Sequence, residues 1–460
     1  MIQISTKDKE KVLVAIRQGK IDAADLSYPN LIDSMILKMK QEGILELLEI
    51  AFLDKRSGNK NIPFHLILTL AITAKMKIKT SLTDVPIAIT NAETLSEIGW
   101  NIWDNERNLE EGLMSEGTLR NLVKKHTVEE LVQAYNIYVQ DHVFPKMDII
   151  PDIHILDCTE MEVELGNSNY EGSEVITDKD GSRRGYKLST LRGLTGDIGV
   201  LEEIKMGSIK QHDLELSRDI LRKSNMLKPG DILINDRGFI SRELMNELKL
   251  ERKVDTYIPL KKNMEAYKQA VSLSTEENNW QAHPNKKRKT QKIAFVEALG
   301  CHWRSETPEN DVEFNACVVH DTAKDEHFVF ITTDLKKTSK QIISTYELRP
   351  EIEEDYRQIK DFWQIEDFKS TKHNFIAFHV VMVLIGYLFF QLYKGMEEGL
   401  KYAGKSLPVA IKKYVENGSK SVIIYAGQYF GIFGFLEFIQ LYALCGTEVK
   451  QCLDPILAKV

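Results

Sequence analysis

The sequence contains the charged segment Ser344-Thr-Tyr-Glu-Leu-Arg-Pro-Glu-Ile-Glu-Glu-Asp-Tyr-Arg-Gln-Ile-Lys360, most of which is predicted to form a helix. Pro350 has a fixed φ and no N–H group, so it suits the first turn of a helix that runs from about Glu351 to Trp363. The apolar side chains in this segment recur at helical spacing and share one face: Ile352, Tyr356, Ile359 and Trp363. That face is predicted to pack against the protein core.

Glu353 is predicted to lie at the edge of this buried face. With Ile352 at zero and about 100° per residue, Glu353 falls at ~100° and Lys360 at ~80°, two turns further along. Side chains at such an edge can reach both an interior site and a bound polyanion. Glu353 is therefore the candidate metal-binding carboxylate of the helix.

Four residues of the segment resemble the Y-R-E-K signature of bacterial transposases of the insertion-sequence-four family. Tyr346, Arg349, Glu353 and Lys360 have the spacing Tyr-x2-Arg-x3-Glu-x6-Lys. Two upstream segments are similar to the same family in its apolar strand ending in Asp-x-Thr and in its Asp-Arg-Gly-Phe motif: Ile153-His-Ile-Leu-Asp-Cys-Thr159 and Ile232-Leu-Ile-Asn-Asp-Arg-Gly-Phe239. The resemblance spans roughly residues 150–379.

The resemblance implies that Asp157, Asp236 and Glu353 are the catalytic residues and the ligands of two Mg²⁺ or Mn²⁺ ions. Carboxylate oxygens suit Mg²⁺, and two divalent ions can stabilise the attacking and leaving oxygens of phosphodiester transfer. Each residue taken alone has a plainer structural explanation, as a strand-end cap, a turn residue or one acid of a solvated helix. The three together with the signature favour catalysis.

The resemblance further implies that Tyr346, Arg349 and Lys360 contact DNA near the scissile end. The sequence departs from the family pattern at two positions. Pro350 stands where the family often has Trp, and Cys158 stands where it often has Ser or Gly. Neither departure removes a functional group.

From residue 150 onward the hydrophobic pattern predicts an α/β core. Strands are predicted at 152–157, 186–194, 198–206 and 232–235, with a hairpin turn at 195–197 and a helix at 211–222. This order is that of an RNase H-like fold, in which an Asp of the first strand lies beside an Asp after the fourth. The predicted fold class is an α/β RNase H-like catalytic core with a β-rich insertion, an all-α N-terminal region and a helical C-terminal region.

Five regions are predicted along the chain. They are a helical DNA-binding region at 1–148, the first part of the core at 149–260, a β-rich insertion at 261–326, the second part of the core with the Glu353 helix at 327–394, and a helical C-terminal region at 395–460. In the first region a short helix over 115–125 would show Arg120, Lys124 and Lys125, and Thr127-Val-Glu-Glu130 is a capping-box pattern. A solvated helical face explains any one of these helices as well as DNA docking does. The resemblance favours DNA recognition for the region as a whole.

The insertion is inferred because far more residues separate Asp236 from Glu353 than one helix and one strand require. It contains β-like runs and the basic tract 286–289. Such an insertion is a feature of the hairpin-forming group of the family, where it supports DNA at the cleavage site. Trp303 is the predicted aromatic contact for a displaced base. Trp280 is a second candidate, and either ring could equally belong to a core.

Composition limits the other functional classes. With 60 basic and 68 acidic residues the net charge is −8, so any DNA-binding surface must be local. The five cysteines contain no C-x2-C pair, which argues against a zinc site, and the N-terminus shows no secretory signal. Residues 375–392 lack Asp, Glu, Lys and Arg and are just long enough to span a membrane. A buried core helix is the favoured interpretation of that stretch.

The functional hypothesis from the sequence is a DNA transposase. It would bind terminal inverted repeats and target DNA, act as a homodimer in a synaptic complex, and cut and join strands, with hairpin ends as a candidate route. We expect a bacterial cytoplasmic, nucleoid-associated protein without a membrane partner. The alternatives are another RNase H-like nuclease and a catalytically inactive DNA-binding protein derived from a transposase.

Overall fold

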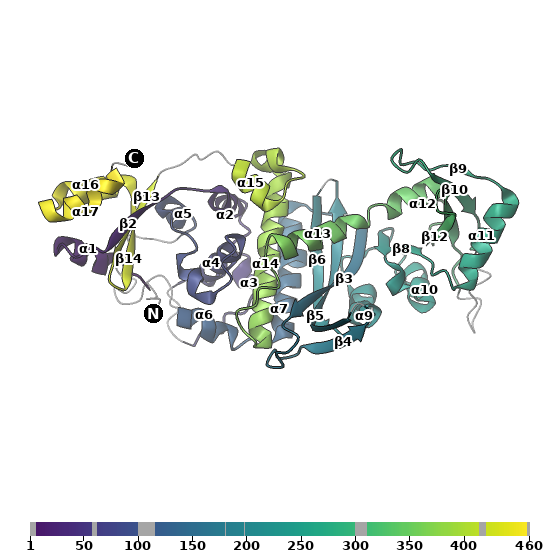
Figure 1. Cartoon of the computed structure of the whole chain (residues 1–460), viewed down its shortest axis with the longest axis horizontal. Helices are drawn as coiled ribbons and strands as arrows, with labels where there is room; N and C mark the ends of the chain where they lie inside the picture. The colour runs from purple at the N-terminus through teal and green to yellow at the C-terminus, as the bar shows by residue number, and fades with distance from the viewer. Residues whose placement is uncertain are drawn as a thin grey trace. The chain divides into compact units, whose positions relative to one another are not determined.

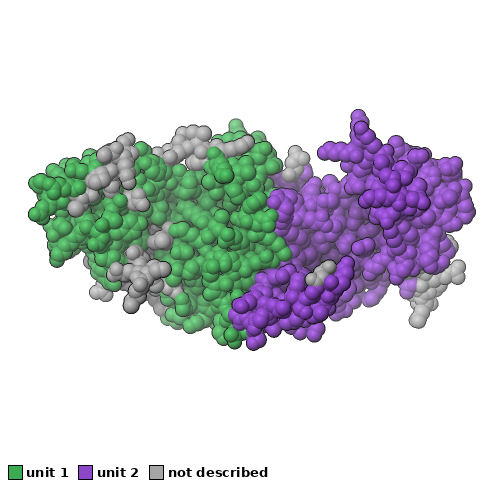
Figure 2. Space-filling model, viewed as in Figure 1, with its two compact units in different colours: residues 1–147, 169–171, 358–460 green, residues 148–168, 172–357 purple. Residues whose placement is uncertain are grey.

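The computed structural model describes residues 6–57, 62–99, 116–179, 181–196, 198–299, 311–413 and 420–457. The chain divides into two units (Figure 2). Unit 1 contains residues 1–147, 169–171 and 358–460, and unit 2 contains residues 148–168 and 172–357. Asp157, Asp236 and Glu353 all belong to unit 2.

Unit 2 is built on a mixed sheet in which β3 (Ile153–Val163) lies between β5 (Gly181–Thr195) and β7 (Ile232–Asn235). On one side, β5 and β6 (Ile198–Ser208) form an antiparallel hairpin next to β3. On the other side, β7 runs parallel to β3, and β8 (Asp255–Pro259) runs parallel to β7. The predicted strands and hairpin are confirmed. The first core strand lies beside the fourth, as expected.

Two amphipathic helices of unit 2 follow from their sequence patterns. α9 (Asp213–Lys223) packs on β5 and β6, and α10 (Arg242–Leu250) packs on β8. Side chains of His212 and Ser241 accept hydrogen bonds from the first turns of these helices. Each helix has acidic residues in its first turn and basic residues in its last, which complements the helix dipole.

The segment predicted to be an insertion continues the core sheet. β12 (Glu326–Thr332) pairs antiparallel with β8 and continues through β11 (Asn315–Asp321) and β10 (Gln291–Val296) to β9 (Gln281–Ala282). α11 (Glu265–Glu277) packs on β10, β11 and β12. With β4 (Glu174–Asp178) pairing with the start of β5, the described strands of unit 2 form one sheet of ten. The β-like runs predicted in this part of the sequence are therefore strands.

The signature segment forms two helices, α12 (Ser339–Tyr346) and α13 (Pro350–Asp361). Thr338 begins α12 with a capping box that it shares with Gln341. Pro350 is the first residue of α13, as its missing N–H group predicts. The four side chains predicted to share the buried face of this segment are all buried: Ile352, Tyr356, Ile359 and Trp363.

The long helix α14 (His373–Gly395) belongs to unit 1 (Figure 1). It packs against α4 (Phe64–Met76), α7 (Val128–Ile137) and α2 (Leu31–Gln41). In the described part of the chain, α14 is the one helix long and apolar enough to cross a membrane, and 89% of its most apolar window is buried inside the protein. This finding agrees with the expectation of a buried core helix.

The expectation of an all-α N-terminal region and a helical C-terminal region is wrong. Two short N-terminal strands, β1 (Thr6–Lys7) and β2 (Ala23–Ser27), join β13 (Ser421–Ala426) and β14 (Tyr429–Gly434) in a four-stranded sheet. β2 contains Ala-Ala-Asp-Leu-Ser, which lacks a strand-like alternation of apolar residues. It becomes a strand because it pairs with β13, almost four hundred residues later in the chain.

Two predictions for the N-terminal region, a capping box at 127–130 and a short helix over 115–125, agree with the structure. Thr127 and Glu130 form the predicted capping box at the start of α7. A short helix, α6 (Glu116–Val123), forms where basic residues were expected to be displayed. Helices α1 (Lys9–Arg17), α16 (Phe435–Leu444) and α17 (Thr447–Leu457) surround the small sheet with a core that includes Val12, Phe433 and Phe438.

Candidate active site

Asp157 and Asp236 occupy neighbouring parallel strands at the same level of the sheet. Leu156 of β3 is the register partner of Asn235 of β7, so the next residue on each strand is an aspartate. Adjacent strands lie about 4.8 Å apart. Asp157 is only 9% exposed, and Asp236 directly precedes the short helix η3 (Arg237–Phe239). The two aspartates predicted from separate motifs therefore lie side by side.

Arg349 links the strand carboxylate to the helix carboxylate. Its guanidinium donates from Nη2 to Oδ2 of Asp157 at 2.9 Å and from Nη1 to Oε1 of Glu353. The side chain of Glu353 is 54% exposed and that of Arg349 is 18% exposed. The Nε–H group of Arg349 is buried and has no hydrogen-bond partner among the described residues. An unmet guanidinium N–H group beside two carboxylates can donate a hydrogen bond to a phosphate oxygen.

Tyr356 fixes the distance between α13 and β3. Its hydroxyl donates a hydrogen bond to the backbone carbonyl of Asp157 at 2.8 Å and is also within hydrogen-bonding contact of Oγ1 of Thr190 on β5. The sequence prediction placed Tyr356 on the apolar face and missed this polar role. The available signal was the hydroxyl itself, because a buried tyrosine hydroxyl usually has a hydrogen-bond partner.

Arg192 anchors α13 to the sheet a second time. This β5 residue pairs through Nε with Asp355 at 2.6 Å and through Nη1 with Glu351 at 3.0 Å. The side chains of Arg192 and Asp355 are 8% and 7% exposed. Buried pairs of this kind cost several kcal/mol when one partner is removed, because the other charge is left unpaired. Both contacts hold the helix that carries Glu353 in one orientation.

The charges at this site shift the pKa of Asp157. Burial raises the pKa to about 6, the nearby guanidinium of Arg349 and the backbone N–H of Cys158 oppose the rise, and Asp236 and Glu353 add to it. Burial also raises the pKa of Tyr346, whose hydroxyl lies within the influence of the same three carboxylates. Asp236 and Glu353 therefore act on the pKa of Asp157 and on that of Tyr346 in the same direction as burial.

One known family matches more than half of the chain. The sequence profile described as "Transposase DDE domain" matches residues 151–389, which is more than half of the chain. The chain belongs to the DDE transposase family. The match covers the core sheet, the inserted strands, α13 and most of α14. No individual curated protein matches the sequence.

Membership in the DDE transposase family gives the fold and the general chemistry. The catalytic core is RNase H-like, the substrate is DNA, and DDE transposases in general use divalent metal ions and have nuclease and transposase activity. The three carboxylates supply the oxygen donors that Mg²⁺ prefers. In the described part of the chain, however, no group of three His, Cys, Asp or Glu side chains is arranged closely enough to hold a metal ion. The carboxylate oxygens of Asp157, Asp236 and Glu353 are the kind of donor that fits a divalent metal ion. The guanidinium of Arg349 pairs with two of these three acids.

The other predicted DNA contacts have different surroundings. The ring of Tyr346 packs on Phe330 with centroids 4.7 Å apart. Lys360 lies in the last turn of α13 and pairs with Glu366 at 3.2 Å. Trp303 lies outside the described residues. Trp280 packs at a tilt against two histidine rings, with centroid distances of 5.6 Å to His320 and 6.1 Å to His327.

The basic tract 286–289 is exposed in the segment between β9 and β10. Arg288 from this tract pairs with Glu347, just after α12, at 2.6 Å. One of the four cations therefore has a structural partner next to the signature segment.

Proposed function

We propose that the protein is a transposase that binds the terminal inverted repeats of its own element, cuts the DNA there and joins the freed ends to target DNA. Two observations support this proposal most strongly. Asp157 on β3 and Asp236 directly after β7 lie at neighbouring positions of the sheet. Arg349 donates hydrogen bonds to Asp157 and to Glu353 of α13. Carboxylates close to one another repel when ionised, so they need a cation nearby. A need for a cation is typical of a metal-dependent site.

In this proposal Asp157, Asp236 and Glu353 hold two Mg²⁺ or Mn²⁺ ions. The ions would activate water and offset charge on the attacking and leaving oxygens. Arg349 would use its unmet Nε–H group to hold a phosphate of the scissile strand. Tyr346 and Lys360 are assigned to DNA contacts from the signature.

The reaction has two balanced steps. In the first, a water oxygen attacks the phosphorus at the end of the element, the bond to the 3′ oxygen breaks, and a 3′-hydroxyl and a 5′-phosphate result. In the second, that 3′ oxygen attacks a target phosphodiester, and a new P–O bond replaces the bond to the target's own 3′ oxygen. The residues on β3, β7 and α13 position the phosphate for in-line displacement.

The excision step and the oligomeric state of the active complex are also proposed. The freed 3′-hydroxyl can attack the opposite strand first, which would give covalently closed hairpin ends, and the segment 261–326 is the region proposed to support that step. Two element ends must be held together for concerted joining, so a homodimer in a synaptic complex is proposed. The N-terminal region is proposed to recognise the repeats.

The test replaces each carboxylate with its amide: Asp157→Asn, Asp236→Asn and Glu353→Gln. We expect each change to abolish cleavage of DNA carrying the element's flanking sequences while binding to the same DNA stays within about threefold. Glu354→Gln is the matched control, because Glu354 is exposed on the same helix and pairs with Arg357. Full cleavage by any of the three amide variants would remove that residue from the site.

The same assay separates the alternative functions. An inactive DNA-binding protein would bind end DNA and leave it uncut in both Mg²⁺ and Mn²⁺. A plain nuclease would cut but give no joined products with target DNA. Strand-transfer products that disappear when EDTA is added support the transposase.

A further inference from the structure

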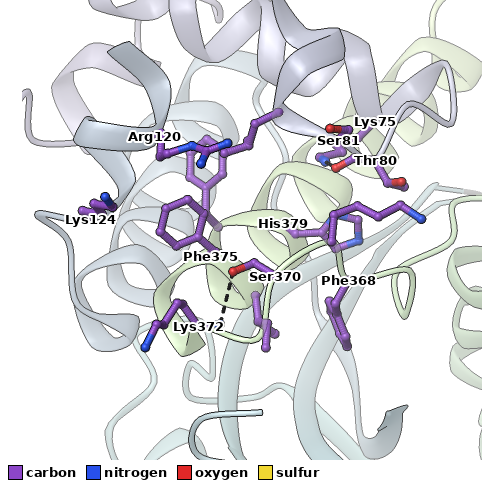
Figure 3. A pocket seen from close by; sticks show the side chains of 14 residues that line it. Lys75, Thr80, Ser81, Arg120, Lys124, Phe368, Ser370, Lys372, Phe375 and His379 are labelled. Carbon is purple, nitrogen blue, oxygen red and sulfur yellow. Dashed lines mark hydrogen bonds between the residues drawn. The ribbon is translucent and has the colours of Figure 1, made fainter. Parts of the chain in front are cut away.

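A pocket in unit 1 has no role in the chemistry described above. It lies where the end of α4, the segment 80–82, α6 and the segment leading into α14 meet, and its volume is about 260 Å³ (Figure 3). Figure 3 shows Arg120, Phe375 and Ser370 around its middle, Lys124 and Lys372 toward one end, and Lys75 with Thr80 toward the other. All the residues that line it belong to unit 1.

The charged side chains that line this pocket are all basic. They are Lys75, Arg120, Lys124, Lys369 and Lys372, and the described lining contains no Asp or Glu. Two of them have acidic partners: Lys369 pairs with Asp367 at 2.6 Å, and Lys372 pairs with Glu171. A concave site with one sign of charge concentrates ligands of the opposite sign. The protein as a whole has a net charge of −8, so the basic lining of this pocket differs in sign from the overall charge.

Lys75 and Lys124 provide the available positive charge. Lys75 is only 2% exposed and donates one hydrogen bond from Nζ to the carbonyl of Thr80 at 2.6 Å. A lysine ammonium carries three donors, so two remain for a ligand. Lys124 is exposed and forms no ion pair with any described residue.

The pocket also has an apolar wall. Phe375, Phe368 and Leu82 line it together with the hydroxyl groups of Thr80 and Ser370. Phe375 is half-buried, so its ring is partly accessible. Aromatic rings beside cations are the combination that binds the base and the phosphate of an unpaired nucleotide. The volume is below the ~300–1,000 Å³ of sites for drug-sized ligands and suits one nucleotide rather than a duplex.

We propose that this pocket binds one unpaired nucleotide of the DNA substrate, with Lys124 and Lys75 on its phosphate and Phe375 against its base. The assignment rests on the proposed DNA transposase function for the choice of DNA as the ligand. It places a second DNA contact in unit 1, apart from the carboxylates of unit 2. It also gives Lys124, the residue that directly follows α6, a specific role.

The experiment measures binding by fluorescence anisotropy with the full chain carrying Asp236→Asn, so that cleavage does not interfere. The probes are a blunt duplex, the same duplex with a five-nucleotide single-stranded overhang, and deoxyadenosine monophosphate with inorganic phosphate as competitors. The variants are Lys124→Gln and Phe375→Leu. The control is Lys146→Gln, because Lys146 is exposed in unit 1 and does not line the pocket. Circular dichroism checks that each variant is folded.

We expect the overhang to tighten binding at least fivefold and both pocket variants to remove that gain, whereas Lys146→Gln retains it. Lys124→Gln should also lower the salt dependence of overhang binding by about one ion, since one phosphate contact is lost. Phe375→Leu should leave the salt dependence unchanged. Competition by the mononucleotide at micromolar concentration would identify a free nucleotide as the natural ligand and overturn the assignment to DNA.

Two further results would also overturn the proposal. The first is equal binding of both duplexes by every variant. The second is an equal loss of affinity in Lys124→Gln and Lys146→Gln, which would indicate a general charge effect. Because cleavage is not measured, failure of the pocket leaves the test of the three carboxylates unaffected.

Discussion

The hydroxyl of Tyr356 donates a hydrogen bond to the backbone carbonyl of Asp157 at 2.8 Å. This bond joins the helix that carries Glu353 directly to the residue that lies beside Asp236. Tyr356 is 7% exposed, so water cannot readily replace the bond. The positions of two proposed metal ligands therefore depend on one buried hydroxyl group.

Tyr356→Phe should weaken the site more than the fold. It leaves the carbonyl of Asp157 and the hydroxyl of Thr190 short of a partner, which costs about 1–3 kcal/mol of unfolding free energy. We expect Mn²⁺ affinity and the cleavage rate to fall about tenfold, measured by calorimetry and single-turnover cleavage. Tyr402→Phe is the control, because the buried hydroxyl of Tyr402 has no hydrogen-bond partner among the described residues. Unchanged metal affinity in Tyr356→Phe would contradict this prediction and would mean that Tyr356 only packs in the core.

Arg349→Gln should change how protons compete with metal ions at Asp157. The pKa of Asp157 is about 6, and Arg349 holds it below the value that burial alone would give. In the unmodified protein, Mn²⁺ affinity should fall as the pH drops through about 6, because the protonated carboxyl is a poor ligand. Without the guanidinium the pKa rises, so the fall should begin at a higher pH.

Calorimetric titration of Mn²⁺ between pH 5 and 8 gives the midpoint for each protein. Arg357→Gln serves as the comparison, since Arg357 pairs with Glu354 on the same helix. An identical midpoint for Arg349→Gln and the unmodified protein would contradict the assigned coupling.

The buried cluster of His154 with Glu202 and Asp231 should make stability depend on pH. Nδ1 of His154 lies 2.5 Å from Oε1 of Glu202, and Nε2 lies 3.1 Å from Oδ2 of Asp231. Burial alone would lower the pKa of His154, but the two carboxylates outweigh it and raise the pKa to about 9. Folding therefore favours the protonated ring. The contribution is complete below the unfolded pKa near 6.5 and is lost as the pH rises through 9.

From ~1.36 kcal/mol per pKa unit, the loss is at most about 3 kcal/mol. Urea unfolding at pH 6, 7.5, 9 and 10 should show a decline that His154→Gln removes. His379→Gln should keep the decline, because burial lowers the pKa of His379 to about 3 and the ring stays neutral throughout this range. A decline of the same size in His154→Gln would assign it to other groups.

Trp303→Ala should separate the first nick from hairpin formation. If this ring supports a displaced base, the variant should nick the element end and fail to form covalently closed ends on denaturing gels. Trp280→Phe is the companion variant. Its ring contacts His320 and His327, so we expect it to change stability and to leave hairpin formation intact. Open breaks without closed ends from the unmodified protein would eliminate the hairpin route.

Local patterns were sufficient to predict much of unit 2. The strands around Asp157 and Asp236 were predicted from apolar runs and turn residues, and α13 was predicted from Pro350 and the spacing of its apolar side chains. These signals are short-range, since a helix or a strand buries residues at a period set by its own geometry. The motif spacings likewise predict Asp157, Asp236 and Glu353 as the catalytic carboxylates.

Tertiary structure decided which groups actually meet. The hydrogen bonds of Tyr356 and Arg349 to Asp157 join residues almost two hundred positions apart, and neither follows from a local pattern. The sheet that combines β2 with β13 was missed for the same reason, because a short strand without alternation gains its hydrogen bonds only from a distant partner. The pocket around Phe375 also needed the fold, since its cations come from three separate segments of the chain. Side-chain period is encoded locally, whereas pairing between distant segments depends on how the whole chain buries its apolar surface.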